Sequence, residues 1–193
     1  MLKKFVFTLF ILLCSFLISK QAFAGVVELG VSGSYRHSNI DRDAFDEASS
    51  FTGSISYYFD EMSALESSYT SGASRRVIGA GSGNDQITTM TYNMLGLDFI
   101  LTLGEKGAVL RPYLKMGAAY IMSKKIYYEY RPFGESTKED PAALVPSAGA
   151  GFKFALTQTL SLKTGIDAWT SRSLYDTPVT IDYAGKAGLS WMF

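Results

Sequence analysis

The feature that most constrains the fold is an alternation of side-chain character that recurs eight times along the chain. In the last stretch, Leu189, Trp191 and Phe193 alternate with small or polar residues. Successive side chains of a strand point to opposite faces, so each stretch predicts a strand with one apolar and one polar face. The predicted strands cover residues 27–36, 50–59, 63–75, 87–102, 110–122, 149–156, 160–168 and 179–193. The phase is ambiguous between Ile87 and Asn93, where we expect a bulge.

The connections between these strands alternate in length. The expected tight turns are Asp60–Met62, Gly104–Gly107 and Thr157–Thr159. The longer, polar connections are His37–Ser49, Ser74–Asp85, Lys124–Val145 and Ser171–Pro178. An even number of strands, with short turns at one end and long loops at the other, is typical of a transmembrane β-barrel. The sequence therefore predicts an all-β fold, an eight-stranded antiparallel up-and-down transmembrane barrel.

The first residues predict export. Lys3 and Lys4 precede an almost wholly apolar run over residues 5–18, and Ala22–Phe23–Ala24 fits the small-x-small pattern of a signal-peptide cleavage site. The run is shorter than the roughly 20 residues that a spanning helix needs. We therefore expect a cleaved signal peptide over residues 1–24 and a barrel domain over residues 25–193.

Composition excludes several function classes for the predicted mature chain. Its only cysteine, Cys14, lies within the signal peptide, which excludes a disulfide scaffold, thiol catalysis and a cysteine-ligated metal. With His37 as the only histidine, we expect no metal and no cofactor. Loss of three lysines with the signal peptide leaves 15 Lys and Arg against 18 Asp and Glu, which gives no electrostatic footprint for nucleic acid.

The same alternation also fits a soluble exported β-sandwich or lipocalin-like barrel, whose apolar face points inward. The polar face favours the membrane reading, because it is rich in small residues and its charges balance, as suits the narrow lumen of eight strands. The predicted lumen charges are Glu28, Glu66, Asp98, Arg111, Lys115, Lys153, Lys163, Asp167, Asp182 and Lys186. Aromatic residues gather near strand ends, as interfacial girdles require. They are Tyr35, Tyr57, Phe59, Tyr69, Tyr120, Trp191 and Phe193.

Four segments carry a resemblance to a known family. They are SISYYFDEMSALESSYTSG (54–72), RPYLKMGAAY (111–120), PSAGAGFKFALTQTLSLKTGID (146–167) and the terminal AGKAGLSWMF. The chain resembles the small outer-membrane β-barrel proteins of Gram-negative bacteria, the OmpA/OmpX-type eight-stranded barrels, over essentially the whole predicted mature chain. The resemblance implies localisation in the outer membrane and a terminal aromatic residue that is read by the barrel-assembly machinery. In this chain the assembly signal would be Leu189, Trp191 and Phe193.

Two non-enzymatic functions fit such a barrel. An interior filled by side chains favours a structural or surface-interaction role, with the Tyr-rich segment 123–146 as the expected contact for an extracellular partner. The alternative is a narrow channel for ions or small solutes. That channel needs a continuous path along Lys153, Lys163 and Lys186, and the balanced charges disfavour it.

A third alternative is a lipid A-modifying acyl hydrolase. His37 would act as the base and Ser38 as the nucleophile. Lipid A deacylases are eight-stranded barrels with a His-x-Ser-Asn motif, whereas His37 and Ser38 are adjacent in this chain. Adjacent residues of a strand point to opposite faces, so we expect no enzymatic activity.

Basic residues gather at the strand ends on the side of the long loops. We expect them to contact lipopolysaccharide phosphates through charge-assisted hydrogen bonds. They are Arg36, Arg75, Arg76, Lys124, Lys125 and Arg172. The expected protein is a monomer whose partners are outer-membrane lipid, lipopolysaccharide and the barrel-assembly machinery.

Overall fold

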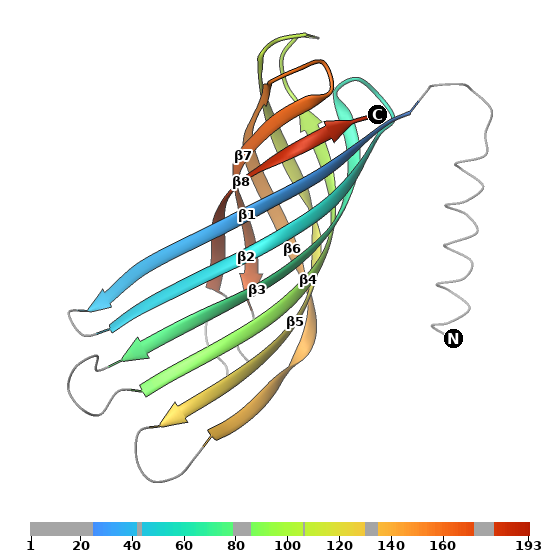
Figure 1. Ribbon diagram of the computed structural model, residues 1–193. Coiled ribbons are helices and arrows are strands. Elements are labelled where there is room, and N and C mark those ends of the chain that lie inside the picture. Colours follow the sequence, from blue (N-terminus) through green and yellow to red (C-terminus); the bar gives the residue numbers. More distant parts are fainter. Residues whose placement is uncertain (1–24, 42–43, 79–85, 106, 130–134, 172–179) are drawn as a thin grey trace, which may run out of the picture.

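The computed structural model describes residues 25–41, 44–78, 86–105, 107–129, 135–171 and 180–193 (Figure 1). The strands are β1 (Val26–Asp41), β2 (Ala44–Tyr58), β3 (Ser63–Ile78), β4 (Gln86–Thr102), β5 (Leu110–Glu129), β6 (Glu135–Ala155), β7 (Leu160–Ser171) and β8 (Thr180–Met192). Each strand pairs antiparallel with the next, and β8 pairs with β1 to close the barrel. The predicted eight-stranded all-β barrel is confirmed. The expected signal peptide lies outside the described residues and stays a prediction.

The two faces of the sheet have opposite chemistry, with the polar face inside. On β1, Glu28 is 2% exposed, whereas its neighbours Leu29 and Val31 are 44% and 51% exposed. On β4, Asp98 is buried between exposed Leu97 and Phe99. A soluble barrel has its apolar side chains inside, so this arrangement argues against that alternative and suits a barrel surrounded by lipid. No helix in the described ranges is long and apolar enough to cross a membrane.

Three tight turns join the strands at one end of the barrel, as predicted. The β2–β3 turn is closed by hydrogen bonds from the amide of Asp60 to the carbonyl of Ser63 and from the amide of Ser63 to the carbonyl of Asp60, both 3.4 Å. In the β4–β5 turn, Gly104 and Gly107 have φ angles of 106° and 85°. Glycine is favoured there because a side chain strains the left-handed conformation.

At the other end, two predicted long loops are wrong. The segment His37–Ser49 is mostly strand, since β1 runs to Asp41 and β2 begins at Ala44. The segment Lys124–Val145 is also mostly strand, since β5 runs to Glu129 and β6 begins at Glu135. The alternation of Lys124, Ile126 and Tyr128 does indicate that β5 continues beyond the membrane. Elsewhere in these segments, paired strands outside lipid carry polar residues on both faces, so the alternation that marks a strand is lost. The remaining two predicted long connections, Ser74–Asp85 and Ser171–Pro178, lie largely outside the described residues; of the first, the part up to Ile78 belongs to β3.

The expected bulge in β4 is also wrong. The pairing of β3 with β4 is continuous from Ser63 opposite Leu101 to Ile78 opposite Gln86. A register shift lies instead between β5 and β6, where Ile121 pairs with Ala143 but Ser123 pairs with Asp140. This shift contains Pro141, which has no amide hydrogen for the strand ladder.

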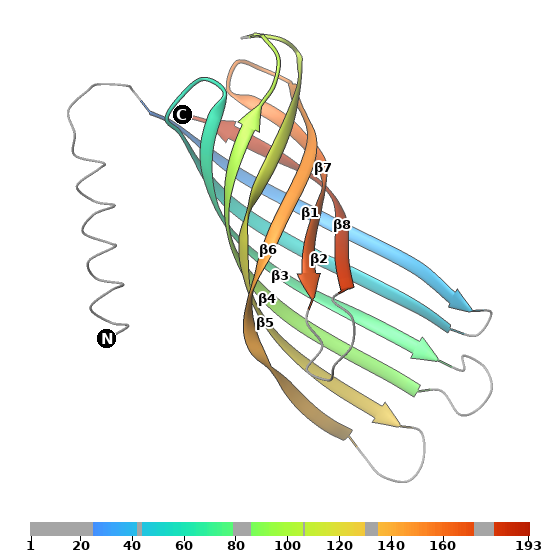
Figure 2. The ribbon, with the colours of Figure 1, turned by 180° about the vertical axis from the view of Figure 1, so that it is seen from behind.

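Six strands extend beyond the other two. β1 pairs with β8 only over Glu28–Ser34, and β6 pairs with β7 only over Ser147–Ala155. Figures 1 and 2 show the ends of β1 to β6 reaching past β7 and β8 at the end opposite the tight turns. We call these extended ends of β1 to β6 the projecting sheet.

Candidate functional site

The inward face of the barrel carries a network of charged side chains. They come from seven of the eight strands. They meet inside the barrel because each lies at an inward-facing position of its own strand. The members are Glu28 (β1), Glu66 (β3), Asp98 (β4), Lys115 (β5), Lys153 (β6), Lys163 and Asp167 (β7) and Lys186 (β8). We call this set the lumen network. It consists of four carboxylates and four ammonium groups, so its formal charge is zero.

Lys115 is the centre of one half of the lumen network. Its Nζ lies 3.0 Å from Asp167 Oδ2, 3.4 Å from Asp98 Oδ2 and 3.7 Å from Glu66 Oε1. Asp167 also pairs with Lys186. One buried ammonium thus holds three carboxylates that would otherwise repel one another.

Glu28 is the centre of the other half. Its Oε2 lies 2.8 Å from Lys153 Nζ, and its Oε1 lies 3.2 Å from Lys163 Nζ. The hydroxyl of Tyr58 donates a 3.0 Å hydrogen bond to the same carboxylate and also contacts Lys153. Lys153 is 1% exposed, so this charge is removed from water as completely as an apolar core residue.

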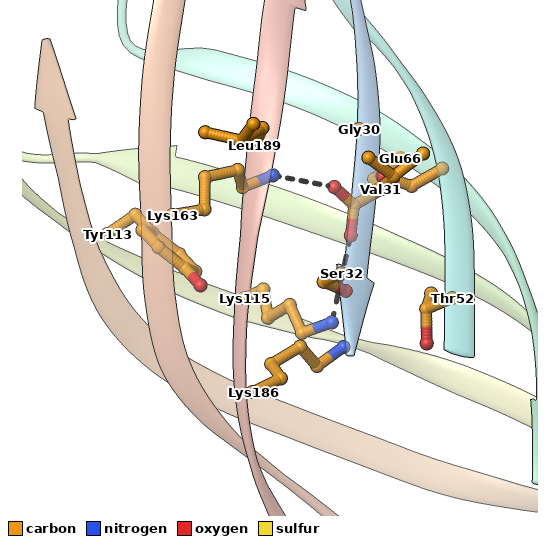
Figure 3. Close-up of a pocket in the computed structure, with 11 residues that line it drawn as sticks. Gly30, Val31, Ser32, Thr52, Glu66, Tyr113, Lys115, Lys163, Lys186 and Leu189 are labelled. Carbon is orange, nitrogen blue, oxygen red and sulfur yellow. Dashed lines mark hydrogen bonds and ion pairs between the residues drawn. The ribbon is translucent and has the colours of Figure 1, made fainter. Parts of the chain in front are cut away.

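Lys163 joins the two halves. Besides Glu28, it contacts Glu66 Oε2 at 3.0 Å, and Glu66 accepts a 3.0 Å hydrogen bond from the hydroxyl of Ser56. Figure 3 shows Lys115 and Lys163 each directed at a different oxygen of the Glu66 carboxylate. The cavity between these side chains measures about 30 Å³, which is close to the volume of one water molecule.

Two of the ten predicted lumen charges stand outside the lumen network. Arg111 and Asp182 are half-buried and form no ion pair within the part of the chain that the structure describes. The Nε of Arg111 is buried without a hydrogen-bond partner. Sequence reasoning assigned no role to Tyr58 and Tyr113, although each lies on the polar face of its predicted strand and that phase is the signal that points inward.

The basic residues near the projecting sheet divide between the two faces. Arg36 and Arg76 both bind Asp46 Oδ2, at 3.3 and 3.4 Å. Asp46 was missed because it lies in a segment that was predicted to be a loop. Arg75 and Lys124 are exposed. The side chain of Lys125 and residue Arg172 lie outside the described residues.

The chain terminus closes the barrel. The amide of Phe193 donates a 2.8 Å hydrogen bond to the carbonyl of Val27, and the rings of Trp191 and Phe193 stack with centroids 6.0 Å apart. Both rings and Leu189 are exposed on the outer surface. The three residues of the expected assembly signal therefore share one outward row on β8 and its end.

The residues of the hydrolase alternative are consecutive in β1. His37 and Ser38 pair through the backbone with Glu47 and Asp46 of β2. The side chains of His37 and Ser38 lie outside the described residues, so the expected absence of enzymatic activity stays a prediction. Within the described ranges, no three His, Cys, Asp or Glu residues form a group that could hold a metal ion.

A closed antiparallel barrel with a charged, ion-paired interior and an apolar exterior is the architecture of an outer-membrane protein. The outer membrane protein beta-barrel domain family matches residues 10–193. The chain belongs to this family. It is an outer-membrane β-barrel protein of the Gram-negative type, as the resemblance implied.

Solved structures show the same fold. The N-terminal β-barrel domain of Pseudomonas aeruginosa OprF is 20% identical with a TM-score of 0.54, over 88% of this chain and 99% of that chain. Neisserial surface protein A is 15% identical with a TM-score of 0.57, over 90% and 100%. Ail of Yersinia pestis is 15% identical with a TM-score of 0.54, over 88% and 99%. No curated protein matches the sequence.

Proposed function

We propose that this protein is a structural and surface-interacting component of the outer membrane with a closed lumen. The observation that supports this role is the lumen network, whose ion pairs cross the barrel from β1 and β3 to β5, β6 and β7. A solute passing through would have to separate several buried pairs at once. Each separation strands a charge in a poorly solvated interior, which is costly. The same closure leaves no site for an enzymatic reaction in the lumen, so we propose a non-enzymatic role.

The projecting sheet is the proposed contact surface for an extracellular partner. Beyond Ser34, β1 has no pairing with β8, and before Ser147, β6 has no pairing with β7, among the described residues. A strand edge of this kind can accept an extended segment of another protein through backbone hydrogen bonds. The two edges differ, because Pro141 and Pro146 lack amide donors on β6, whereas β1 has no proline. The β1 edge is therefore the better acceptor.

A planar-bilayer experiment tests the closed lumen. We expect the refolded barrel, checked for folding by heat-modifiable gel mobility, to give no discrete conductance steps, because the lumen network fills the passage. A Lys153→Ala and Lys163→Ala double variant is the comparison, since it removes two ammonium groups from the lumen and leaves the outer surface unchanged. Reproducible steps from the folded wild-type barrel would contradict the proposal and favour a narrow channel along Lys153, Lys163 and Lys186.

We also propose that the barrel-assembly machinery reads the outward row Leu189, Trp191 and Phe193. A Phe193→Ser variant is expected to reduce the folded, heat-modifiable fraction in outer-membrane preparations severalfold. The matched control is Phe152→Ser, which also removes an exposed phenylalanine but from β6, away from the chain terminus. Equal losses of the folded fraction in Phe193→Ser and Phe152→Ser would contradict a signalling role. An equally large loss when Phe193→Ser is refolded from urea into detergent, without the machinery, would contradict it as well.

A further inference from the structure

The outward face of β3 and β4 changes character abruptly along the strands. Tyr69, Leu95 and Tyr120 lie side by side in register and are all exposed. On the side of the tight turns, the outward residues of β4 are Leu97, Phe99 and Leu101, all apolar. The row that contains Tyr69 is thus the outer limit of the apolar band on β3 and β4, where aromatic residues meet lipid headgroups.

Directly beyond this row, the outward side chains of β3 and β4 are small or polar, and they are flanked by exposed Phe51 on β2 and Met122 on β5. Ser71 pairs with Asn93 in the next row, and Ala73 pairs with Thr91 in the row after it. The hydroxyl of Tyr69 donates a 3.0 Å hydrogen bond to Asn93 Oδ1, which ties the aromatic row to the polar one. A shallow groove crosses β2, β3 and β4, and its lining includes Ser49, Phe51, Ser71, Ala73, Thr91 and Asn93.

Two cations border this groove on the outward face. Lys124 pairs in register with Thr91, and Arg75 is two residues beyond Ala73 on β3. Both are exposed. The neighbouring Arg76 instead belongs to the opposite face, where it binds Asp46. Glu47 lies opposite Arg75 on β2, and Glu139 lies opposite Lys124 on β6. The area that remains favourable for an anion is therefore the one between the two cations, over β3 to β5.

We propose that this surface binds the phosphorylated sugar headgroup of lipopolysaccharide, and we call it the headgroup patch (Ser71, Ala73, Thr91, Asn93, Arg75 and Lys124). The patch is continuous with the apolar band, so acyl chains lie on Leu95 and Leu97 while the headgroup lies above them. Hydroxyl and amide groups suit sugar hydroxyls, and guanidinium and ammonium groups bind phosphate by charge-assisted hydrogen bonds. The small side chains of Ser71 and Ala73 let a sugar ring approach the sheet.

A protein partner fits this surface poorly. β3 and β4 are paired on both sides along their described length, so they offer no edge for strand addition. The core of a protein–protein interface is typically depleted of charged residues, whereas the headgroup patch holds two cations and has Phe51 at its edge, next to Ser71. The chemistry therefore favours a glycolipid over a protein as the occupant.

Binding of purified bisphosphorylated lipid A to the detergent-refolded barrel tests the proposal. We expect an Arg75→Gln and Lys124→Gln double variant to bind about tenfold more weakly, because two charge-assisted contacts to phosphate are lost. Lipid A from which both phosphates have been removed is expected to bind the wild-type barrel as weakly as this variant binds the intact lipid.

The matched control is an Arg36→Gln and Arg76→Gln double variant, which removes the same charge from the opposite face and is expected to bind like the wild type. An Arg75→Lys and Lys124→Arg variant keeps both charges and should recover most of the affinity. Folding of every variant is checked by heat-modifiable gel mobility. Equal binding by the two glutamine variants, or equal binding of lipid A with and without phosphate, would overturn the proposal.

Discussion

Replacement of Lys115 by methionine is expected to lower the free energy of unfolding by about 3–5 kcal/mol, the usual effect of removing one partner from a buried ion pair. Lys115 is 8% exposed and is the cation shared by Glu66, Asp98 and Asp167. Methionine fills a similar volume, so the loss of stability reports the removal of the charge and not a loss of packing. Three carboxylates are then left close together, and only Lys163 and Lys186 remain to balance them.

Urea-induced unfolding in lipid vesicles, followed by gel mobility and tryptophan fluorescence, measures this loss. Lys186→Met is the matched control, because Lys186 has a single carboxylate partner among the described residues and is expected to cost less. Adding Asp98→Asn to Lys115→Met should recover part of the stability, since one unpaired charge is removed. Equal costs for the two lysine variants, or no recovery in the double variant, would contradict the central role of Lys115.

Replacement of Gly188 by alanine is expected to cost about 3 kcal/mol, at the upper end for overpacking of a tight site. A Cβ at this position would overlap the carbonyl oxygen of Val31 and the backbone of Ser32. Both belong to β1, which pairs with β8 at the closing seam. Backbone atoms of a paired strand cannot turn aside as a side chain can, so the seam itself must move.

The same strand supplies a control for this glycine. A Cβ at Gly185 meets no heavy atom within 4 Å, so Gly185→Ala is expected to leave stability unchanged or slightly raised. Both variants are compared by their urea midpoints in the same vesicles. A Gly188→Ala barrel as stable as Gly185→Ala would show that the β1–β8 seam is looser than the structure indicates.

The membrane-embedded part of the fold could be predicted from the sequence because lipid imposes one rule on every strand. Leu97 and Phe99 had to face outward, so Asp98 had to face inward. The rule ends where lipid ends. The described residues within 37–49 and 124–145 are strands outside the lipid, where polar residues suit both faces. Most of them were predicted to be loops for that reason, although the alternation of Lys124, Ile126 and Tyr128 indicated that a strand continues there.

The members of the lumen network could be predicted, but their pairing could not. The inward phase of each strand identifies Glu28 and Lys153 as lumen residues. Whether they meet depends on the stagger of the strands around the whole barrel, since the two residues are 125 positions apart in the chain. The sequence also did not show which basic residues face outward and which face the opposite way. Arg75 and Arg76 are adjacent in sequence, and the face of each is set by the register of the projecting strands.

The short β7–β8 hairpin has a consequence for how the barrel assembles. Within the lumen network, this hairpin supplies Lys163, Asp167 and Lys186, a net charge of +1, and the strands before it supply Glu28, Glu66, Asp98, Lys115 and Lys153, a net charge of −1. The contacts of Lys163 with Glu28 and Glu66 form only when the hairpin reaches its place. The hairpin thus carries the charge that neutralises the lumen charges of the other strands. A barrel that closes between β8 and β1 therefore also has a neutral interior.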